Sequence, residues 1–273
     1  MSAFKKIKTI LSYSFKPNYI IKGIKSPKRV INFLKSDLII EPEDFIFKLI
    51  GENTREIEKY LKEISSKKEF NNYIWEKYNR FEKQLLNKKR ALNAGGTSKE
   101  VGIILYTIIR FLKPEIVLET GVASGISSAY ILLALTENGK GKLFSIDLPY
   151  EINKDYPSGY IKEEGKTFIP QGKEPGWLIP PELKERWYLE LGKSSEKLPQ
   201  LLKKLQSVDI FIHDSEHSYQ NMFFEYQTIW PYLKEKGLLF SHDVNWNKAF
   251  DDFCQEVGRK GVKYRREFGG IKK

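Results

Sequence analysis

The chain has 273 residues, enough for one large domain or for a domain with an appendage. Hydrophobic residues make up 41% of it, which excludes wholesale disorder, and its single cysteine, Cys254, excludes an intramolecular disulfide. Lysines interrupt the apolar residues near the N-terminus, and the longest apolar run, residues 101–109, is far too short to span a bilayer. We therefore expect a soluble, cytoplasmic protein.

The net charge of +11 lies mostly in residues 1–36. Nine basic residues precede the first acidic residue, Asp37, which leaves 37 basic against 35 acidic residues in the rest of the chain. A nearly neutral body argues against a domain that clamps nucleic acid, and no DNA partner is expected. Lysines interleave with apolar residues in this arm. That pattern is typical of a segment on an anionic membrane surface, and equally of an arm packed on its own domain or on a second subunit of a homo-oligomer.

The chain after this arm begins with helices. Apolar residues recur at helical spacing in two segments between residues 43 and 90, which we interpret as two helices. Gly95-Gly96-Thr97-Ser98 then breaks the pattern and offers a helix N-cap, and residues 98–112 form the next predicted helix. We expect a basic arm and helical extension over residues 1–94, followed by a second domain over residues 95–273.

From residue 115 onward, predicted strands and helices alternate. The strands are predicted at 115–120, 142–146, 187–191, 208–213, 237–241 and 262–268, and the helices at 126–137, 195–205, 218–233 and 247–258. This alternation predicts an α/β fold with a doubly wound, mostly parallel, Rossmann-like sheet. Residues 148–182 have no period and are rich in Pro, Gly and aromatic residues, so we interpret them as a lid or binding loop.

The end of the chain is short for such a sheet. Gly269-Gly270 is predicted to be a turn after the strand at 262–268, which leaves only three residues for a last strand. We therefore expect the N-terminal helices or another subunit to complete this edge of the sheet.

Residues 116–128 have the pattern of a strand, a tight turn and a helix. Glu119 closes the strand, and Gly121 and Gly125 lie where the backbone must bend and admit a ligand. Such a turn lies at the carboxyl edge of the sheet, where cofactors bind. The turn reads Gly-x-x-x-Gly where the dinucleotide fingerprint reads Gly-x-Gly-x-x-Gly, and it lacks the Lys-Ser/Thr ending of a phosphate loop. We predict a ligand with a ribose and no phosphate, S-adenosylmethionine, with Glu119 near its amino end through a water or a backbone contact.

Acidic residues end four strands at this edge: Glu119, Asp147, Asp214 and, in the pair His242-Asp243, Asp243. Packing alone does not account for four such ends. Asp147 comes 28 residues after Glu119 at the end of the next strand, where an acid accepts hydrogen bonds from ribose hydroxyls. All three histidines of the chain, His213, His217 and His242, lie at the last two of these ends. We expect His213 to be structural and the other two to belong to the site.

Three segments resemble class I S-adenosylmethionine-dependent methyltransferases of the small-molecule O-methyltransferase branch. Glu119-x-Gly121-x-x-x-Gly125-x-Ser127 is similar to motif I of catechol-type O-methyltransferases. Residues 213–219 are similar to the Asp-Gly-Asp-His-Ser-Tyr segment of sugar and macrolide O-methyltransferases and cephalosporin-hydroxylase-like proteins. Residues 237–244 are similar to the Gly-Gly-x-x-x-x-Asp-Asp segment of that branch. The resemblance implies cofactor contacts from Glu119, Gly121, Ser124, Gly125, Ser127, Asp147, Ser194 and Asp214.

The resemblance also implies the acceptor side of the site. Relatives hold a divalent cation at positions that match Asp214, His242 and Asp243, where His242 replaces an acid, so Mn²⁺ or Fe²⁺ suits the set better than Mg²⁺. The cation would bind the acceptor hydroxyl and lower its pKa. His217 aligns with the residue that deprotonates the acceptor, and Asp214 with Asp243 would orient the acceptor or the cation.

We therefore predict O-methylation of a small hydroxylated acceptor, such as a sugar, a glycolipid or a natural-product-like molecule. Trp177 and Trp246 are candidates to line its pocket, and Asn245 or Asn247 to contact it. One alternative is an RNA methyltransferase guided by residues 1–36. Another is a non-catalytic protein that binds S-adenosylmethionine, because His242 replaces an acid.

Overall fold

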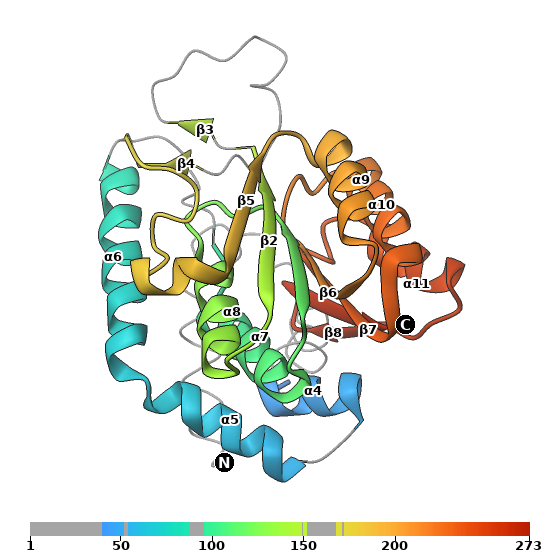
Figure 1. Ribbon diagram of the computed structural model, residues 1–273, viewed down its shortest axis with the longest axis horizontal. Coiled ribbons are helices and arrows are strands. Elements are labelled where there is room, and N and C mark those ends of the chain that lie inside the picture. Colours follow the sequence, from blue (N-terminus) through green and yellow to red (C-terminus); the bar gives the residue numbers. More distant parts are fainter. Residues whose placement is uncertain (1–39, 52–53, 88–95, 149, 152–167, 171) are drawn as a thin grey trace, which may run out of the picture.

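The computed structural model describes residues 40–51, 54–87, 96–148, 150–151, 168–170 and 172–273. A seven-stranded sheet runs through its centre, with strand order β5-β2-β1-β6-β7-β9-β8 (Figure 1). Its strands are β1 (Ile116–Thr120), β2 (Lys142–Asp147), β5 (Trp187–Leu191), β6 (Val208–His213), β7 (Leu233–His242), β8 (Val262–Tyr264) and β9 (Phe268–Lys272). The first five in this order are parallel, and β9 is antiparallel to both of its neighbours. The predicted doubly wound, mostly parallel, Rossmann-like fold is confirmed.

Helices cover both faces of this sheet. The described helices are α4 (Pro42–Ile50), α5 (Thr54–Ser66), α6 (Lys68–Asn87), α7 (Lys99–Leu112), α8 (Ile126–Glu137), α9 (Ser194–Leu205), α10 (Tyr219–Ile229) and α11 (Ala249–Glu256), with 3₁₀ turns η1 (Pro181–Arg186) and η2 (Trp230–Tyr232). One buried cluster joins the sheet to α4, α5, α7 and α8, and a second joins it to α9, α10 and α11. None of the described helices is long and apolar enough to cross a membrane.

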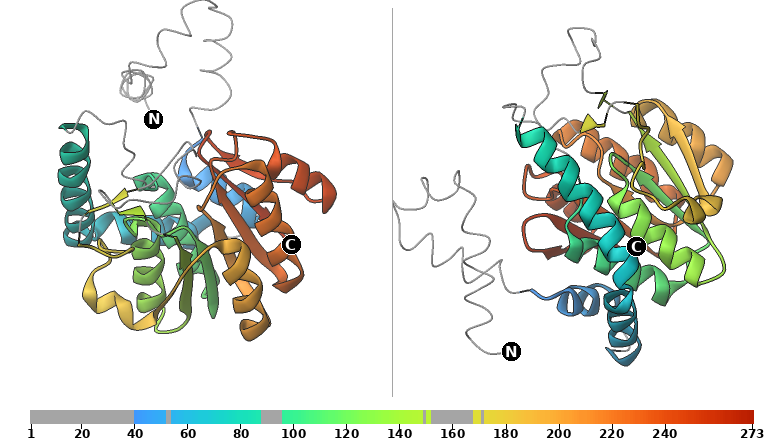
Figure 2. Two further views of the ribbon diagram at one scale, coloured as in Figure 1. Left: turned by 90° about the horizontal axis from the view of Figure 1, so that it is seen from above. Right: turned by 90° about the vertical axis from the view of Figure 1, so that its left-hand side faces the viewer.

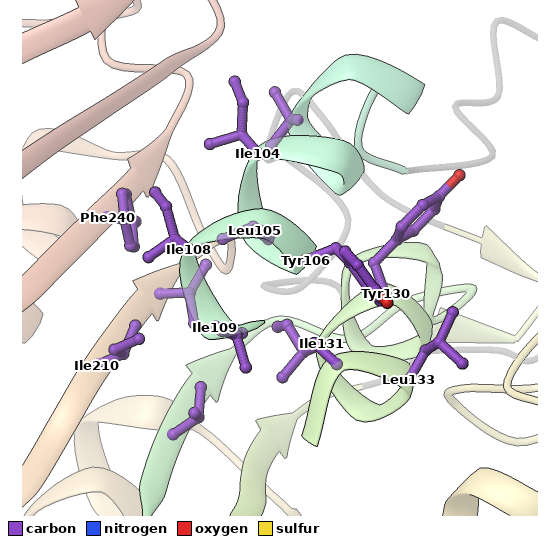
Figure 3. Close-up of a cluster of buried hydrophobic side chains, with 14 of the residues drawn as sticks. Ile104, Leu105, Tyr106, Ile108, Ile109, Tyr130, Ile131, Leu133, Ile210 and Phe240 are labelled. Carbon is purple, nitrogen blue, oxygen red and sulfur yellow. The ribbon is translucent and has the colours of Figure 1, made fainter. Parts of the chain in front are cut away.

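The first cluster includes one helix, α8, that is buried on every side. Every residue of α8 from Ile126 to Leu135 is buried, as expected of a helix sandwiched between the sheet and other helices. Figure 3 shows Ile108 and Ile109 of α7 between α8 and the strand residues Ile210 and Phe240. This core holds the strand ends in place.

The N-terminal helices differ from the sequence prediction. Three helices replace the predicted two, because Gly51 adopts φ 76° and its N–H caps α4 by donating to the Phe47 carbonyl. The ring of Phe45 packs on those of Tyr264 and Phe268, so α4 shares its core with the end of the sheet. The α6 helix runs along the outside of α8 (Figure 2), where the Trp75 indole donates to the Tyr130 hydroxyl. The predicted domain boundary near residue 94 stays a prediction.

The predicted end of the sheet is wrong. Gly269 and Gly270 are extended residues inside β9, and the turn lies before them. A Cβ on Gly269 would lie 2.9 Å from Val244 Cγ1, and one on Gly270 would lie 2.8 Å from Leu49 Cδ2. The two glycines thus admit close side chains on both faces of the strand and do not form a turn. The described chain supplies the edge strands β9 and β8 itself, and α4 of the N-terminal helices packs on them through Phe45 and Leu49.

Smaller differences concern element ends and the long loop. The β7 strand begins at Leu233, four residues before its predicted start, because α10 ends at Ile229. In the predicted loop, β3 (Tyr150–Glu151) pairs with β4 (Phe168–Ile169), while residues 152–167 lie outside the described residues. The segment from residue 172 onward packs against the turn after β1.

Candidate active site

Glu119 lies beneath the turn after β1 and is fully buried. Its carboxylate accepts hydrogen bonds from three hydroxyls: Ser127 (2.5 Å), Ser128 (2.6 Å) and Ser145 (3.1 Å). Burial raises the pKa of Glu119 to about 7, although the three hydroxyls favour its charged form. The Trp187 indole also donates to Ser145 at 2.9 Å. Glu119 thus ties the start of α8 to β1 and β2, and a contact with the cofactor's amino end stays a prediction.

The turn needs glycine at positions 121 and 125 because other backbone segments of the protein lie where a Cβ atom would be. Gly121 has φ 84°, and a Cβ there would lie 2.0 Å from the carbonyl oxygen of Asp214. Gly125 has φ 86°, and a Cβ there would lie 2.6 Å from Gly176 Cα. The sequence pattern predicted a ligand in this space, but backbone atoms occupy it beside both glycines. The turn is held between the loop after β6 and the segment at residue 176.

That segment also hydrogen-bonds to the turn. The Gly176 N–H donates to the Ala123 carbonyl (2.9 Å), and the Leu178 N–H donates to the Ser124 carbonyl (3.1 Å). Trp177, between these two donors, is half-buried and packs edge-to-face on Phe81 of α6, with ring centroids 5.4 Å apart. Its indole nitrogen is buried and has no hydrogen-bond partner within the part of the chain that the structure describes. A role of Trp177 in the acceptor pocket stays a prediction.

Asp147 presents a buried oxygen beside the turn. Backbone N–H groups of Val122, Ala123 and Leu148 hydrogen-bond to its carboxylate, while Oδ2 is buried without a hydrogen-bond partner among the described residues. Burial raises the pKa of Asp147 to about 6 against the opposing effect of these N–H groups. A buried acceptor oxygen without a partner suits the ribose hydroxyl that the sequence analysis placed here.

The turn between β5 and α9 lies beside Asp147. The Gly192 N–H donates to the Asp147 carbonyl at 2.9 Å. Ser194, predicted to lie near the adenine, donates from its hydroxyl to Asn221 Oδ1 at 3.3 Å. This bond connects the turn to α10, and an adenine contact from Ser194 stays a prediction.

The ends of β6 and β7 bring together two carboxylates and two imidazoles. His217 Nε2 lies 3.5 Å from Asp214 Oδ1 and 3.5 Å from Asp243 Oδ2. His242 Nε2 lies 3.8 Å from Asp214 Oδ2 and 3.1 Å from the Thr97 hydroxyl. Side chains 29 positions apart in the sequence therefore meet, because parallel strands deliver their carboxyl ends to one edge. We call Asp214, His217, His242 and Asp243 the acid–histidine cluster.

The pKa values of the two imidazoles in the cluster are shifted in opposite directions. Burial lowers the pKa of His217, but the carboxylates of Asp214 and Asp243 outweigh it and raise this pKa above its ordinary value. Burial likewise lowers the pKa of His242, and there the nearby carboxylates do not compensate, so the pKa stays below its ordinary value. Burial raises the pKa of Asp243. Divergent acidities of neighbouring groups are typical of acid–base sites.

The same geometry tests the predicted cation. His217 Nε2 lies between the carboxylates of Asp214 and Asp243, in the space that an ion bridging them would need. Within the described ranges, no group of three or more His, Cys, Asp or Glu side chains is arranged to hold a metal ion. The side chains as they lie do not fit a divalent cation, and Asp214, His242 and Asp243 as metal ligands stay a prediction.

The residues after β7 frame the cluster. Asp243 has φ 51°, a conformation uncommon for a residue other than glycine, and its N–H donates to the Glu267 carbonyl at 2.7 Å. The Trp246 ring is 56% exposed and lies 5.3 Å from the His217 ring. The Asn247 amide donates to the His217 carbonyl at 2.9 Å, so it positions the loop. Acceptor contacts from Trp246, Asn245 or Asn247 stay predictions.

Sequence reasoning missed two residues of this region, Thr97 and Glu225. Thr97 belongs to the predicted break before α7, and nothing in its sequence context indicates the bond to His242. Glu225 is fully buried in α10 and pairs with His213, which is also fully buried. A signal for Glu225 existed, because Met222, Glu225, Tyr226 and Ile229 share one helical face, so the acid stands in an apolar stripe.

Comparisons with known proteins give one family match and several similar solved structures. The family model described as a methyltransferase domain matches residues 118–244, from β1 to just after β7. A search of curated proteins found no match. Solved structures similar to the chain include a putative caffeoyl-CoA O-methyltransferase from Staphylococcus aureus, with 12% identity, 66% of this chain and 86% of that chain covered, and a TM-score of 0.47. Another is an O-methyltransferase from Bacillus cereus in complex with SAH, with 11% identity, 85% and 96% covered, and a TM-score of 0.46.

The matched residues contain the features that the sequence and the fold single out. They include the glycine turn, Asp147 with its buried oxygen, and the acid–histidine cluster, all at the carboxyl edge of the sheet. A methyltransferase domain on this fold uses S-adenosylmethionine as its methyl donor. Residues 118–244 thus match a methyltransferase domain, in agreement with the predicted S-adenosylmethionine-dependent methyltransferase.

Proposed function

We propose that the protein transfers the methyl group of S-adenosylmethionine to a hydroxyl oxygen of a small acceptor, such as a sugar, a glycolipid or a natural-product-like molecule. The observation that carries this proposal is the position of His217 Nε2 between Asp214 and Asp243, at the same edge as the cofactor turn. A base with this support suits the removal of a hydroxyl proton. The half-exposed carboxylates of both acids suit the orientation of a polar acceptor.

The residues divide the reaction between them. When bound, S-adenosylmethionine would supply a reactive methyl group on a positively charged sulfur, for transfer to the acceptor oxygen. Asp147 and the backbone of the glycine turn hold the donor, and the acid–histidine cluster aligns the acceptor. His217 Nε2 takes the hydroxyl proton, and the carboxylates of Asp214 and Asp243 stabilise the resulting imidazolium. The acceptor itself is sought by a metabolite screen with methyl-labelled cofactor.

Replacing Asp147 by alanine should weaken S-adenosylmethionine binding about 10- to 100-fold, because the ribose loses a charged acceptor. Isothermal titration calorimetry measures this change directly. The control is Asp251→Ala, which removes an exposed carboxylate of α11 that makes no hydrogen bond to Asp147 or to the glycine turn in the part of the chain that the structure describes. Unchanged affinity in Asp147→Ala would remove this residue from the cofactor site.

The same residue predicts a pH dependence of cofactor binding. The pKa of Asp147 is raised to about 6. The charged carboxylate accepts hydrogen bonds from the ribose hydroxyls at both oxygens, whereas protonation turns one oxygen into a donor. The affinity for S-adenosylmethionine should therefore fall as the pH drops through about 6 and level off above it. Calorimetry between pH 5 and 8 tests this, and the Asp147→Asn variant should lose this part of the dependence. An equally steep dependence in that variant contradicts the assignment.

The basic segment at residues 1–36 supports contact with an anionic lipid surface, although it lies outside the described residues. We expect the whole chain to co-sediment with vesicles of phosphatidylcholine and phosphatidylserine in low salt, and to be released by high salt. A chain without residues 1–36 should stay in solution, as should the whole chain with pure phosphatidylcholine. Equal binding by the shortened chain overturns this role. Steeply salt-dependent binding of RNA by these residues would instead favour an RNA acceptor.

A further inference from the structure

Glu225 is a fully buried acid in the middle of α10, and its carboxylate is surrounded by donors. These are the Thr120 hydroxyl (2.5 Å), His213 Nδ1 (2.7 Å), the Ser215 hydroxyl (2.7 Å) and the Asn221 amide (3.2 Å). The first two meet Oε2 and the last two meet Oε1, so both oxygens have two partners. A buried carboxylate satisfied in this way is held in one position.

The charge of the Glu225 carboxylate determines which nitrogen of His213 carries a proton. Burial raises the pKa of Glu225, but His213 and the hydroxyls of Ser194 and Thr120 outweigh it and hold the pKa below its ordinary value. A charged carboxylate only accepts hydrogen bonds, so His213 Nδ1 carries a proton and donates it. The His213 ring lies edge-on to that of His217, with 5.4 Å between their centroids.

Three of the donors come from the ends of β1 and β6 and from the loop after β6. Thr120 directly precedes Gly121 of the cofactor turn, whereas His213 and Ser215 flank Asp214 in the loop that carries His217. Asn221 extends the network to the turn after β5 through its bond from Ser194. Glu225 therefore contacts groups at the ends of β1 and β6 at once, from a helix behind both.

We propose that Glu225 is a positioning residue that couples the cofactor turn to the acceptor loop. A shift of Thr120 when the cofactor binds passes through the Glu225 carboxylate to His213, and from its ring to His217. This inference rests on the proposed function, in which His217 is the base that the coupling would align when the cofactor binds. An apolar residue of similar size in α10 would fill the same volume and connect neither loop.

The test uses S-adenosylhomocysteine, so it needs no acceptor. The three histidines of the chain give a simple imidazole NMR spectrum in protein with ¹⁵N-labelled histidine. His213 is fully buried, so its signals report on the network and not on direct ligand contact. We expect saturating S-adenosylhomocysteine to shift the His213 signals of the wild type. In Thr120→Val, which keeps the side-chain shape and loses the donor, this shift should fall to less than half.

Glu225→Gln tests the centre of the network. An amide has one acceptor oxygen and one donor nitrogen in place of two acceptor oxygens. The hydroxyl facing the nitrogen can turn to accept, but the N–H on that side, from His213 or from Asn221, loses its acceptor. We expect about tenfold weaker S-adenosylhomocysteine binding and loss of the His213 Nδ1 proton signal, since one lost bond to a charged group has about that effect. Gln227→Ala, an exposed change two residues further along α10, should behave as wild type.

The outcomes separate this proposal from the proposed function. A wild-type His213 shift in Thr120→Val at saturation, or wild-type affinity in Glu225→Gln, overturns the coupling. If Glu225→Gln fails to fold, Thr120→Val still decides. A wrong base leaves these binding measurements unchanged and appears as normal turnover in His217→Ala. A wrong acceptor class also leaves them unchanged and appears as absent turnover of that class by the wild type.

Discussion

Replacing His217 by alanine should lower kcat about 10²- to 10⁴-fold and leave the affinity for S-adenosylmethionine within about twofold. The imidazole lies between Asp214 and Asp243 and makes none of the contacts expected to hold the cofactor. Initial rates with the acceptor found by screening give kcat, and calorimetry gives the affinity. Glu216→Ala, an exposed change next to it in the sequence, is the matched control.

The pH profile sharpens this prediction. Only a neutral His217 accepts the hydroxyl proton, so kcat should fall as the pH drops below its pKa. Two carboxylates raise that pKa above its ordinary value, which places the acid limb of the profile at higher pH. Removing one charge with Asp243→Asn should move this limb to lower pH. A wild-type rate in His217→Ala, or an unmoved limb in Asp243→Asn, would exclude His217 as the base.

Replacing Gly121 by alanine should abolish measurable cofactor binding and lower Tm. The new Cβ would lie 2.0 Å from the Asp214 carbonyl oxygen, which is backbone and cannot rotate away. A shift of either strand end would break the bonds from the Gly121 N–H to Ile146 and from the Asp214 N–H to Thr120, both 2.8 Å. The cofactor turn after β1 and the loop after β6 would then move apart.

Gly139→Ala is the control for this change. Gly139 also has a positive φ, 67°, but no atom lies within 4 Å of the position of its Cβ. It should therefore show only the conformational cost of a left-handed alanine, about 1–2 kcal/mol, and normal cofactor binding. Thermal unfolding and calorimetry on both variants separate conformational strain from the clash. Similar behaviour of the two variants would show that the close approach at Gly121 is unimportant.

The cofactor side was largely predictable from the sequence because its signals are local. The turn at Gly121 and Gly125 follows one strand and opens one helix, and Asp147 ends the next strand, so spacing along the chain defines them. The cluster of His217 with Asp214 was also predictable, since three residues separate them. Asp243 joins them through a general property of parallel sheets, which bring all carboxyl ends to one edge.

The sequence by itself thus determined the sheet class, the edge that carries the candidate site and most of the polar residues that meet there. Only the tertiary structure decided what these residues touch. Glu119 points inward and accepts hydrogen bonds from three serines. Backbone atoms lie beside the glycines where a ligand was predicted, and Gly269-Gly270 belong to a strand and not to a turn. The tertiary structure also joined Glu225 to Thr120, 105 positions away. The physical reason is that periodicity and turn chemistry are properties of neighbours in the chain, whereas burial and hydrogen-bond partners depend on elements that meet only after packing.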